Sequence, residues 1–472
     1  MKPRSLFLAV ITILLLPLGA SADEGAHFAN GLKIGEVTPN SAIIWTRLTK
    51  HPERNIEGTP FPKNKDKKRR SLSYDDLDSM EGAVPGIAGE VRLVYREAAK
   101  QGDEVKGQWF GVDGDANFTR QFKIEGLKAG TSYEVTFEAR SASGEKTASV
   151  KGGFATAPAD GVAAPVSFSV VTGQDYPRRD DKANGHQIYP KMKELGVDFF
   201  VHTGDIEYYD KAAPFADNIE LARFKWNRLY SMPFQRDFHN HTASYFMKDD
   251  HDTLKNDAWP GQHYGDLTWE DGLKLFPEQV PMGKKTYRTI RWGKDLQIWL
   301  VEGRDFRSPN NMSDGPNKTI WGEEQKQWFF ETVKASDATF RVLISPTPVV
   351  GPDRGNKNDN HANKGFTHEG DELRAFIASQ RNMFVACGDR HWQYVSVDPK
   401  TGLREYSCGP TADEHASGFK EENRSAMHRY LNIKGGFLRV EVCRESGEPK
   451  IAFRHHGVTG ELYNEDVQIA DR

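Results

Sequence analysis

The sequence contains very little cysteine. Only three of the 472 residues are cysteine, namely Cys387, Cys408 and Cys443, and all three lie in the last fifth of the chain. This scarcity excludes a small fold held together by many disulfides. A single disulfide between Cys387 and Cys408 is one interpretation. The second interpretation is that all three cysteines are small buried residues without a disulfide, and the odd number of cysteines favours it.

The sequence also lacks a strong excess of charge. Its 63 Lys and Arg residues and 67 Asp and Glu residues give a net charge of -4, so no electrostatic argument supports a nucleic-acid-binding surface. The basic run at residues 63–70 indicates either a solvated loop or a binding patch. A hydrophobic content of 37% with 11% aromatic residues excludes a disordered chain, and the length implies two or three domains.

Long hydrophobic runs are missing after the N-terminus, so no later segment is predicted to span a membrane. Residues 1–22 combine two early basic residues, an apolar run over residues 6–18 and a small-residue site at residues 20–22. This layout is typical of a secretory signal peptide. We expect cleavage after Ala22 and a periplasmic or secreted mature protein, and an uncleaved membrane anchor is the alternative. The sequence leaves the oligomeric state open.

The first part of the mature chain, residues 23–158, consists of short β-rich runs bounded by Gly, Pro, Ser or Asn. Short strands at this spacing without a helical period predict an all-β sandwich domain. The run "GLKAGTSYEVTFEA" at residues 126–139 resembles the Leu-x-x-x-Thr-x-Tyr corner of fibronectin type III domains. In that resemblance Tyr133 would tie the end of one sheet to its neighbour.

A different pattern begins after the small, proline-containing linker at residues 155–165. The runs "VSFSVVTG" and "VDFFVHTGD" are apolar and β-rich, and "NGHQIYPKMKELG" between them has helical spacing. Strand, helix and strand in succession predict a βαβ unit with a buried, mainly parallel sheet. The fold class predicted for residues 164–472 is therefore α/β.

Polar side chains follow the apolar runs of this segment, where the strands are expected to end. Functional groups in open α/β sheets collect at the carboxyl ends of the strands. Carboxylates, imidazoles and a phenol at one edge are the donors that a two-metal site requires, together with an open position for substrate and water. The residues concerned are Asp175, Asp205, Tyr208, Asp250, His251, Arg304, Arg307, Asp389 and His391.

Within this set, Asp205 is placed to bridge two ions. Tyr208 follows three residues later and could turn back to the same ion, where a phenolate donor favours a hard trivalent ion such as ferric iron over zinc. Asp250, Asp389 and His391 would provide further ligands. The sequence therefore predicts a centre of two metal ions at this edge of the sheet.

Four motifs, "GDIEY", "KDDHD", "EGRDFRSP" and "CGDRHW", give the chain a family resemblance. In this order, behind a fibronectin-like domain and a signal peptide, they resemble the alkaline phosphatase D (PhoD-like) family of calcineurin-like metallophosphatases. The Gly-Asp-x-x-Tyr pattern also resembles the purple acid phosphatases, in which that tyrosine binds ferric iron. The resemblance implies a four-layer α/β sandwich and hydrolysis of phosphomonoesters or phosphodiesters at a centre of two or more metals, such as Fe and Ca.

The resemblance also implies a ligand set. Asp205 matches the bridging aspartate and Tyr208 the iron-binding tyrosine. Asp250 matches a ligand of the second metal, in the position of the Asn or Asp of a Gly-Asn-His-Asp type motif. Asp389 and His391 match the late Asp-x-His ligands.

Catalytic and substrate-binding roles follow from the same resemblance. His251 would serve the leaving group or bind phosphate, and Arg304 would neutralise the phosphoryl oxygens while a metal-bound hydroxide attacks phosphorus. Arg307 would either share the role of Arg304 or form a structural ion pair. The loop at residues 345–366, with Arg354 and His361, could line the mouth of the substrate site, bind calcium or simply be a solvated loop.

One position departs from the family pattern. The family usually has Ser-Cys-Gln-Asp at the end of the first strand, with the thiolate on iron, and this chain has Gly173 in place of that cysteine. Either Asp175 or water replaces the sulfur, which favours Mg, Mn, Ca or Zn, or the ferric position is weakened or lost. Two alternatives to a phosphoesterase follow: a binding protein built on a degraded phosphatase, and a hydrolase of another ester such as a phospholipid.

Overall fold

The computed structural model describes residues 25–61, 76–100, 102–141 and 143–471. The predicted signal peptide at residues 1–22 and the basic run at residues 63–70 lie outside the described residues. No helix in the described part of the chain combines the length and the apolar character needed to cross a membrane.

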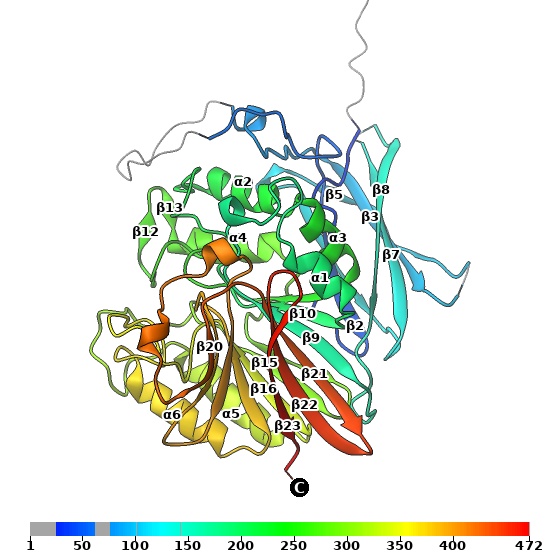
Figure 1. The fold of residues 1–472 in the computed structure, drawn as a ribbon. Helices are drawn as coiled ribbons and strands as arrows, with labels where there is room; N and C mark the ends of the chain where they lie inside the picture. The colour runs from blue at the N-terminus through cyan, green and yellow to red at the C-terminus, as the bar shows by residue number, and fades with distance from the viewer. Residues whose placement is uncertain (1–24, 62–75, 101, 142, 472) are drawn as a thin grey trace, which may run out of the picture.

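A nine-stranded sheet forms one half of the molecule (Figure 1). Its four central strands are parallel to their neighbours and its outer strands pair antiparallel. The central strands are buried along their whole length, as expected for a parallel sheet covered on both faces. In spatial order the strands are β23 (Leu462–Ile469), β22 (Glu448–His456), β21 (Phe437–Glu445), β9 (Val166–Val171), β10 (Phe199–His202), β11 (Ala243–Phe246), β1 (Leu32–Gly35), β2 (Ser41–Arg47) and β6 (Thr119–Glu125).

A seven-stranded sheet forms the other half. Four of its strands, β15, β16, β17 and β19, again run parallel, so their carboxyl ends lie at one edge. In spatial order the strands are β14 (Arg288–Trp292), β15 (Leu296–Leu300), β16 (Phe340–Ser345), β17 (Met383–Cys387), β19 (Arg404–Cys408), β18 (Gln393–Val397) and β20 (His428–Asn432).

Helices cover the outer face of each sheet. Tyr189 of α1 and Phe238 of α3 pack on Phe200 of the nine-stranded sheet. Phe329 of α5 and Leu373 of α6 pack on the seven-stranded sheet, which gives the order helix, sheet, sheet, helix. The helices are α1 (Ile188–Glu194), α2 (Ile219–Leu229), α3 (Pro233–His241), α4 (Trp269–Gln279), α5 (Gly322–Ala335) and α6 (Thr367–Ala378), and a hairpin of β12 (His263–Tyr264) and β13 (Leu267–Thr268) lies beside α2 and α4.

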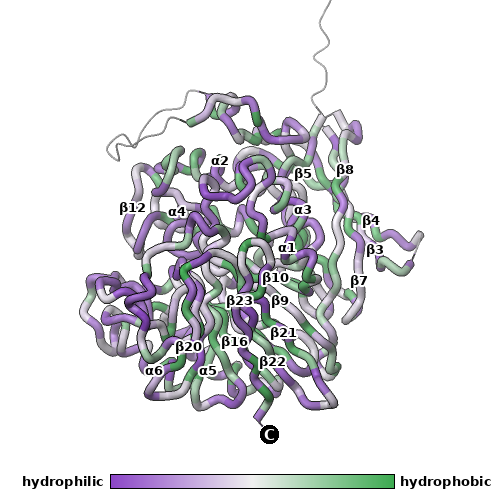
Figure 2. The backbone as a smooth tube through the Cα atoms, viewed as in Figure 1, coloured by the Kyte–Doolittle hydropathy of each residue, from purple (hydrophilic) through white to green (hydrophobic). Residues whose placement is uncertain are grey.

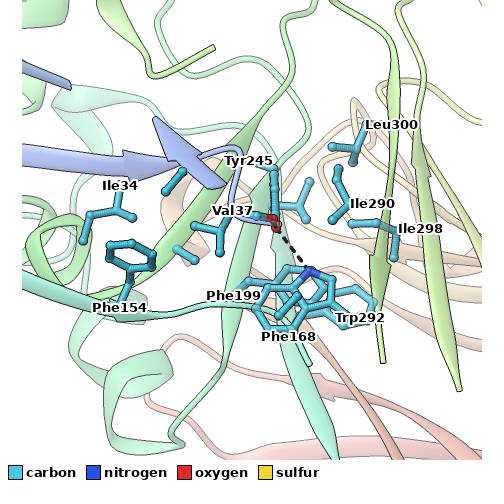
Figure 3. Packing of buried hydrophobic residues seen from close by; sticks show 14 of the residues in the cluster. Ile34, Val37, Phe154, Phe168, Phe199, Tyr245, Ile290, Trp292, Ile298 and Leu300 are labelled. Atoms are coloured by element: carbon cyan, nitrogen blue, oxygen red, sulfur yellow. Dashed lines mark hydrogen bonds between the residues drawn. The ribbon is translucent and has the colours of Figure 1, made fainter. Parts of the chain in front are cut away.

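The two sheets enclose the main hydrophobic core, and in Figure 2 hydrophobic segments lie along their strands, interrupted by hydrophilic ones. The ring centroid of Phe199 lies 4.6 Å from that of Phe168 and 4.6 Å from that of Trp292. The indole nitrogen of Trp292 donates to the hydroxyl of Tyr245 at 3.1 Å, as Figure 3 shows. That hydroxyl in turn donates to the carbonyl of Val37 at 2.5 Å, so one phenol links both sheets.

Tyr245→Phe is expected to lower the free energy of unfolding by about 1–3 kcal/mol, because it leaves a buried indole N–H and the Val37 carbonyl without a partner. Denaturation in urea of the two proteins measures the difference. Tyr95→Phe is the control, since Tyr95 is only partly buried, and an equal loss in both variants would contradict the assignment.

A five-stranded sheet packs beside the nine-stranded one and is built from the N-terminal segment. Its strands are β4 (Val105–Lys106), β3 (Gly89–Glu97), β7 (Ser132–Arg140) and β8 (Lys146–Ala155), with β5 (Phe110–Val112) paired to β3. The hydroxyl of Tyr133 accepts from the backbone N–H of Lys128 at 2.9 Å. This bond ties the segment after β6, in the nine-stranded sheet, to β7 in the five-stranded sheet, and the fibronectin III-like assignment of this region stays a prediction.

Strands β1, β2 and β6 differ from the expected organisation, because they come from residues 23–158 yet belong to the nine-stranded sheet. Ile34 of β1 pairs in parallel with Ala243 of β11. This pairing covers an otherwise open edge of the central sheet, so one sheet continues across the expected linker.

All three cysteines are free, and Cys387 and Cys408 are buried, as in the interpretation without a disulfide.

Five short 3-10 helices complete the description: Leu77–Ser79, Gly114–Ala116, Tyr176–Arg178, Asp413–His415 and Glu421–Asn423.

Candidate functional site

The carboxyl ends of the parallel strands in both sheets border one cavity of about 400 Å³. Segments following β9, β10, β11, β16, β17 and β19 contribute its walls, so residues far apart in the sequence meet there. Seven residues predicted for the site line it: Asp175, Asp205, Tyr208, Asp250, His251, Asp389 and His391.

The backbone at two of these strand ends is held in an unusual conformation. Asp205 has φ of 54° and Asp389 has φ of 61°, in the left-handed region that few residues other than glycine adopt. Each follows a glycine, and a Cβ at Gly204 would lie 2.7 Å from the backbone nitrogen of Asp249. Strain of this kind persists where the surroundings fix it and is common at functional sites, and here it sets the direction of two carboxylates.

A phenol, a carboxylate and an imidazole converge after β10 and β17. The hydroxyl of Tyr208 donates to Oδ2 of Asp205 at 3.0 Å and lies 3.0 Å from Nε2 of His391. Nε2 of His391 is also 3.5 Å from Oδ2 of Asp205. Three donor atoms of the types that bind iron, manganese or zinc thus lie within contact of one another.

Two overlapping groups of carboxylates and imidazoles could hold metal ions. Asp205, Asp250 and His251 form one group, and Asp205, Asp249 and Asp389 form the other, with the ligand atoms of each group within 4.8 Å of one another. Asp205 belongs to both, which is the position of a bridging ligand.

The buried oxygens of this cluster fit a cation. Oδ1 of Asp205 and Oδ2 of Asp249 have no hydrogen-bond partner among the described residues. Burial raises the pKa of Asp205 to about 7, because a carboxylate away from water is costly without a positive partner. A bound metal ion would satisfy both oxygens, so the residues present fit a two-ion centre.

His251 lies among carboxylates at the cavity. Its Nδ1 lies 2.5 Å from Oδ1 of Asp210. Burial lowers the pKa of His251, but Asp250 and Asp210 outweigh that effect and raise the pKa to about 10. The imidazolium is therefore available as a proton donor or as a binding group for an anion.

Three predicted residues do not reach the cavity. Arg304 is completely buried; its Nε donates to Oδ1 of Asp249 at 2.7 Å, and its Nη2 lies 2.5 Å from the same oxygen in an ion pair. Arg307 donates to Asn310 and to a backbone carbonyl, and Nε2 of His361 lies 2.9 Å from Glu369. Buried acceptors thus surround both guanidinium groups, no ion pair of Arg307 is formed among the described residues, and the substrate roles expected for Arg304 and Arg307 stay predictions.

Comparison with known proteins places the chain in a family. A model of the family described as PhoD-like phosphatase matches residues 168–462. The chain belongs to the PhoD-like phosphatase family. It is 20% identical over 485 residues to alkaline phosphatase D of Bacillus subtilis (strain 168), an alignment that covers 88% of this chain and 75% of that protein.

Two solved structures show the same fold as this PhoD-like phosphatase. One is a structure of PhoD, with a TM-score of 0.70 and 17% identity, covering 95% of this chain and 90% of that chain. The other is a purple acid phosphatase, PPD1 from yellow lupin (Lupinus luteus) seeds, with a TM-score of 0.64 and 10% identity, covering 93% and 73%. The predicted family, the mixed α/β fold and the assignment as a phosphatase-type hydrolase are therefore confirmed.

Several residues at the cavity of this PhoD-like phosphatase were not predicted as site residues. Asp249 lies beside the predicted Asp250 in "KDDHD", and His415 follows β19. Three further cations, Arg178, Lys211 and Lys357, line the cavity together with Arg354, whose loop was expected to be able to line the substrate mouth. The adjacent acids in "KDDHD" are the sequence signal for Asp249, whereas Arg178, on a short 3-10 helix, and the loop residues Lys211 and Lys357 have no such local signal.

Asp175 lines the cavity but belongs to neither group of potential ligands. Its Oδ2 lies 3.3 Å from Nε of Arg178. Asp175 is therefore paired at the wall of the cavity, and the ligand role predicted for it stays a prediction.

Proposed function

We propose that this chain is an exported, metal-dependent phosphoesterase that hydrolyses phosphomonoesters, phosphodiesters or both. The observation that carries the proposal is the position of Asp205, which is shared by two groups of buried potential ligands in a cavity lined by cations. The proposal includes a signal peptide at residues 1–22, a fibronectin III-like region at 23–158 and a four-layer catalytic region at 164–472.

The metal ligands would come from three strand ends, those of β10, β11 and β17. Asp205 would bridge the ions, with Tyr208 and His391 on one side and carboxylates from the "KDDHD" and "GDRH" segments around them. Bound metal ions supply Lewis-acid stabilisation of the phosphoryl charge and lower the pKa of water at neutral pH. Candidate ions are Fe and Ca from the family resemblance, or Mg, Mn and Zn given Gly173.

The protein's own side chains would bind and protonate the substrate. Arg354 and Lys357 would contact the phosphoryl oxygens, as charge-assisted hydrogen bonds at the cavity allow. His251, held by Asp210, would give its proton to the oxygen of the leaving alcohol. Because Nδ1 pairs with Asp210, Nε2 is the nitrogen that would donate this proton.

The proposal is tested by removing and restoring metal. Protein treated with a chelator is reconstituted with Fe, Ca, Mg, Mn or Zn, singly and as Fe with Ca. Metal content is measured together with the hydrolysis of p-nitrophenyl phosphate and of bis(p-nitrophenyl) phosphate. Turnover that depends on bound metal is expected. Metal binding without turnover would favour a binding protein. The absence of both metal binding and turnover would refute the metal centre.

Arg354→Met is expected to lower kcat/KM about 10- to 100-fold, the equivalent of one hydrogen bond between charged groups, mainly through KM. Arg354 lines the cavity and its side chain is 34% exposed, so the fold should tolerate the change. Steady-state kinetics with both p-nitrophenyl substrates measure the effect. The exposed Arg381 gives the control Arg381→Met, and an unchanged KM for Arg354→Met would remove this residue from the substrate site.

A further inference from the structure

Position 173, just after the end of β9, offers no side chain to the cavity, because it is Gly173, with φ of 58°. A Cβ built at this position would lie 3.1 Å from Nε2 of His391 and 3.4 Å from Cε1 of His415. A side chain at position 173 would therefore project directly against these two imidazoles. The space is filled instead by His415, which comes from the 3-10 helix Asp413–His415 after β19.

The contacts of His415 fix how its ring is presented. Nδ1 lies 3.0 Å from the carbonyl oxygen of Gly173, which accepts only from a protonated nitrogen. In the neutral imidazole Nε2 is then the nitrogen without a proton, and among the described residues the ring's hydrogen bond is the one at Nδ1, which leaves Nε2 free. Metal-binding histidines commonly donate their second N–H to a carbonyl in this way.

The ring also lies among the potential ligands. Its centroid is 4.1 Å from that of His391 and 5.2 Å from that of Tyr208. The residue is 2% exposed and lines the same cavity.

We propose that His415 is a metal ligand, binding through Nε2 the ion that Tyr208 and His391 also bind, in place of a ligand from the end of the first strand. This inference rests on the proposed function. It gives the ion nitrogen and oxygen donors and no thiolate, a set that suits Fe, Mn or Zn better than softer ions.

The test compares metal affinity in the wild type, His415→Phe and His415→Leu. Phenylalanine keeps an aromatic ring beside Tyr208 and His391 but has no nitrogen, and leucine is the second variant should the larger ring fail to fold. Metal-free proteins are titrated with Mn²⁺ by calorimetry, and bound metal per chain is counted by elemental analysis. His263→Phe controls for surface imidazoles, because His263 is exposed on the β12 hairpin.

The expected result is that one of the two Mn²⁺ sites of the wild type weakens by about 10- to 100-fold in both His415 variants, the scale seen when a metal site is disturbed, while His263→Phe is unchanged. Unchanged affinity in a folded His415 variant overturns this inference alone, provided the wild type binds metal and turns over substrate. A wild type that binds no metal overturns the inference and the proposed function together.

Discussion

Asp205→Asn is expected to reduce turnover by about 10³-fold or more, on the scale of losing a principal electrostatic contribution to a transition state. The substitution keeps the size of the side chain but replaces a charged carboxylate with a neutral amide. Because Asp205 belongs to both groups of potential ligands, the loss should affect both ions and not one. Elemental analysis should find less than half of the metal that the wild type binds, and phosphatase assays should show kcat reduced.

The control is Asp237→Asn. Asp237 is exposed and pairs with Lys193 on the surface, so its removal takes away one negative charge without touching the cavity. The free energy of unfolding gives a second test of Asp205. Burial raises the pKa of Asp205 to about 7, so the metal-free Asp205→Asn protein should be no less stable than the metal-free wild type above pH 7. Metal content and kcat near wild-type values in Asp205→Asn would refute the bridging role.

The strand ends of the site could be predicted because their information is local. Asp205 and Asp389 each follow a glycine at or close after the end of an apolar run, and a buried strand with a polar end can be recognised within about ten residues of sequence. The hydrophobic runs likewise predicted β9, β10 and β17. Parallel pairing then brings their carboxyl ends to one edge without any further information.

The features that the sequence did not predict depend on long-range pairing or on loop paths. β1 could not be assigned to the central sheet because its partner β11 is far away in the chain, and its own residues fit either sheet. Arg304 and Arg354 both follow strand ends, yet Arg354 lines the cavity and Arg304 does not. No local pattern separates them, because the difference arises from which buried acceptor each guanidinium meets.

His415 illustrates the same limit. Its segment, residues 409–419, is rich in small and polar residues, a composition that many loops share. Its importance arises only when β19 lies next to β17 and the loop after it covers Gly173. The absence of a side chain at one strand end and the presence of an imidazole from another are visible together only in three dimensions.

Arg304→Met is expected to lower the free energy of unfolding by about 3–5 kcal/mol, because removing one partner of a buried ion pair leaves the other charge without compensation. Oδ1 of Asp249 would lose its hydrogen bond from Nε and its ion-pair contact with Nη2, in a site where Asp249 is 1% exposed. Methionine retains most of the volume, so the loss reports on charge more than on packing. Denaturation in urea of the metal-free proteins measures it.

The matched comparison is with Arg354→Met, which should change the free energy of unfolding by no more than about 1 kcal/mol, since Arg354 forms a partly exposed ion pair. Arg304 should therefore affect stability and Arg354 should affect KM. The double variant Arg304→Met/Asp249→Asn should recover part of the lost stability, because no buried charge is left alone. Near wild-type stability with a raised KM in Arg304→Met would instead mean that its guanidinium leaves Asp249 to bind the phosphoryl group, and that the catalytic role expected from the sequence was right.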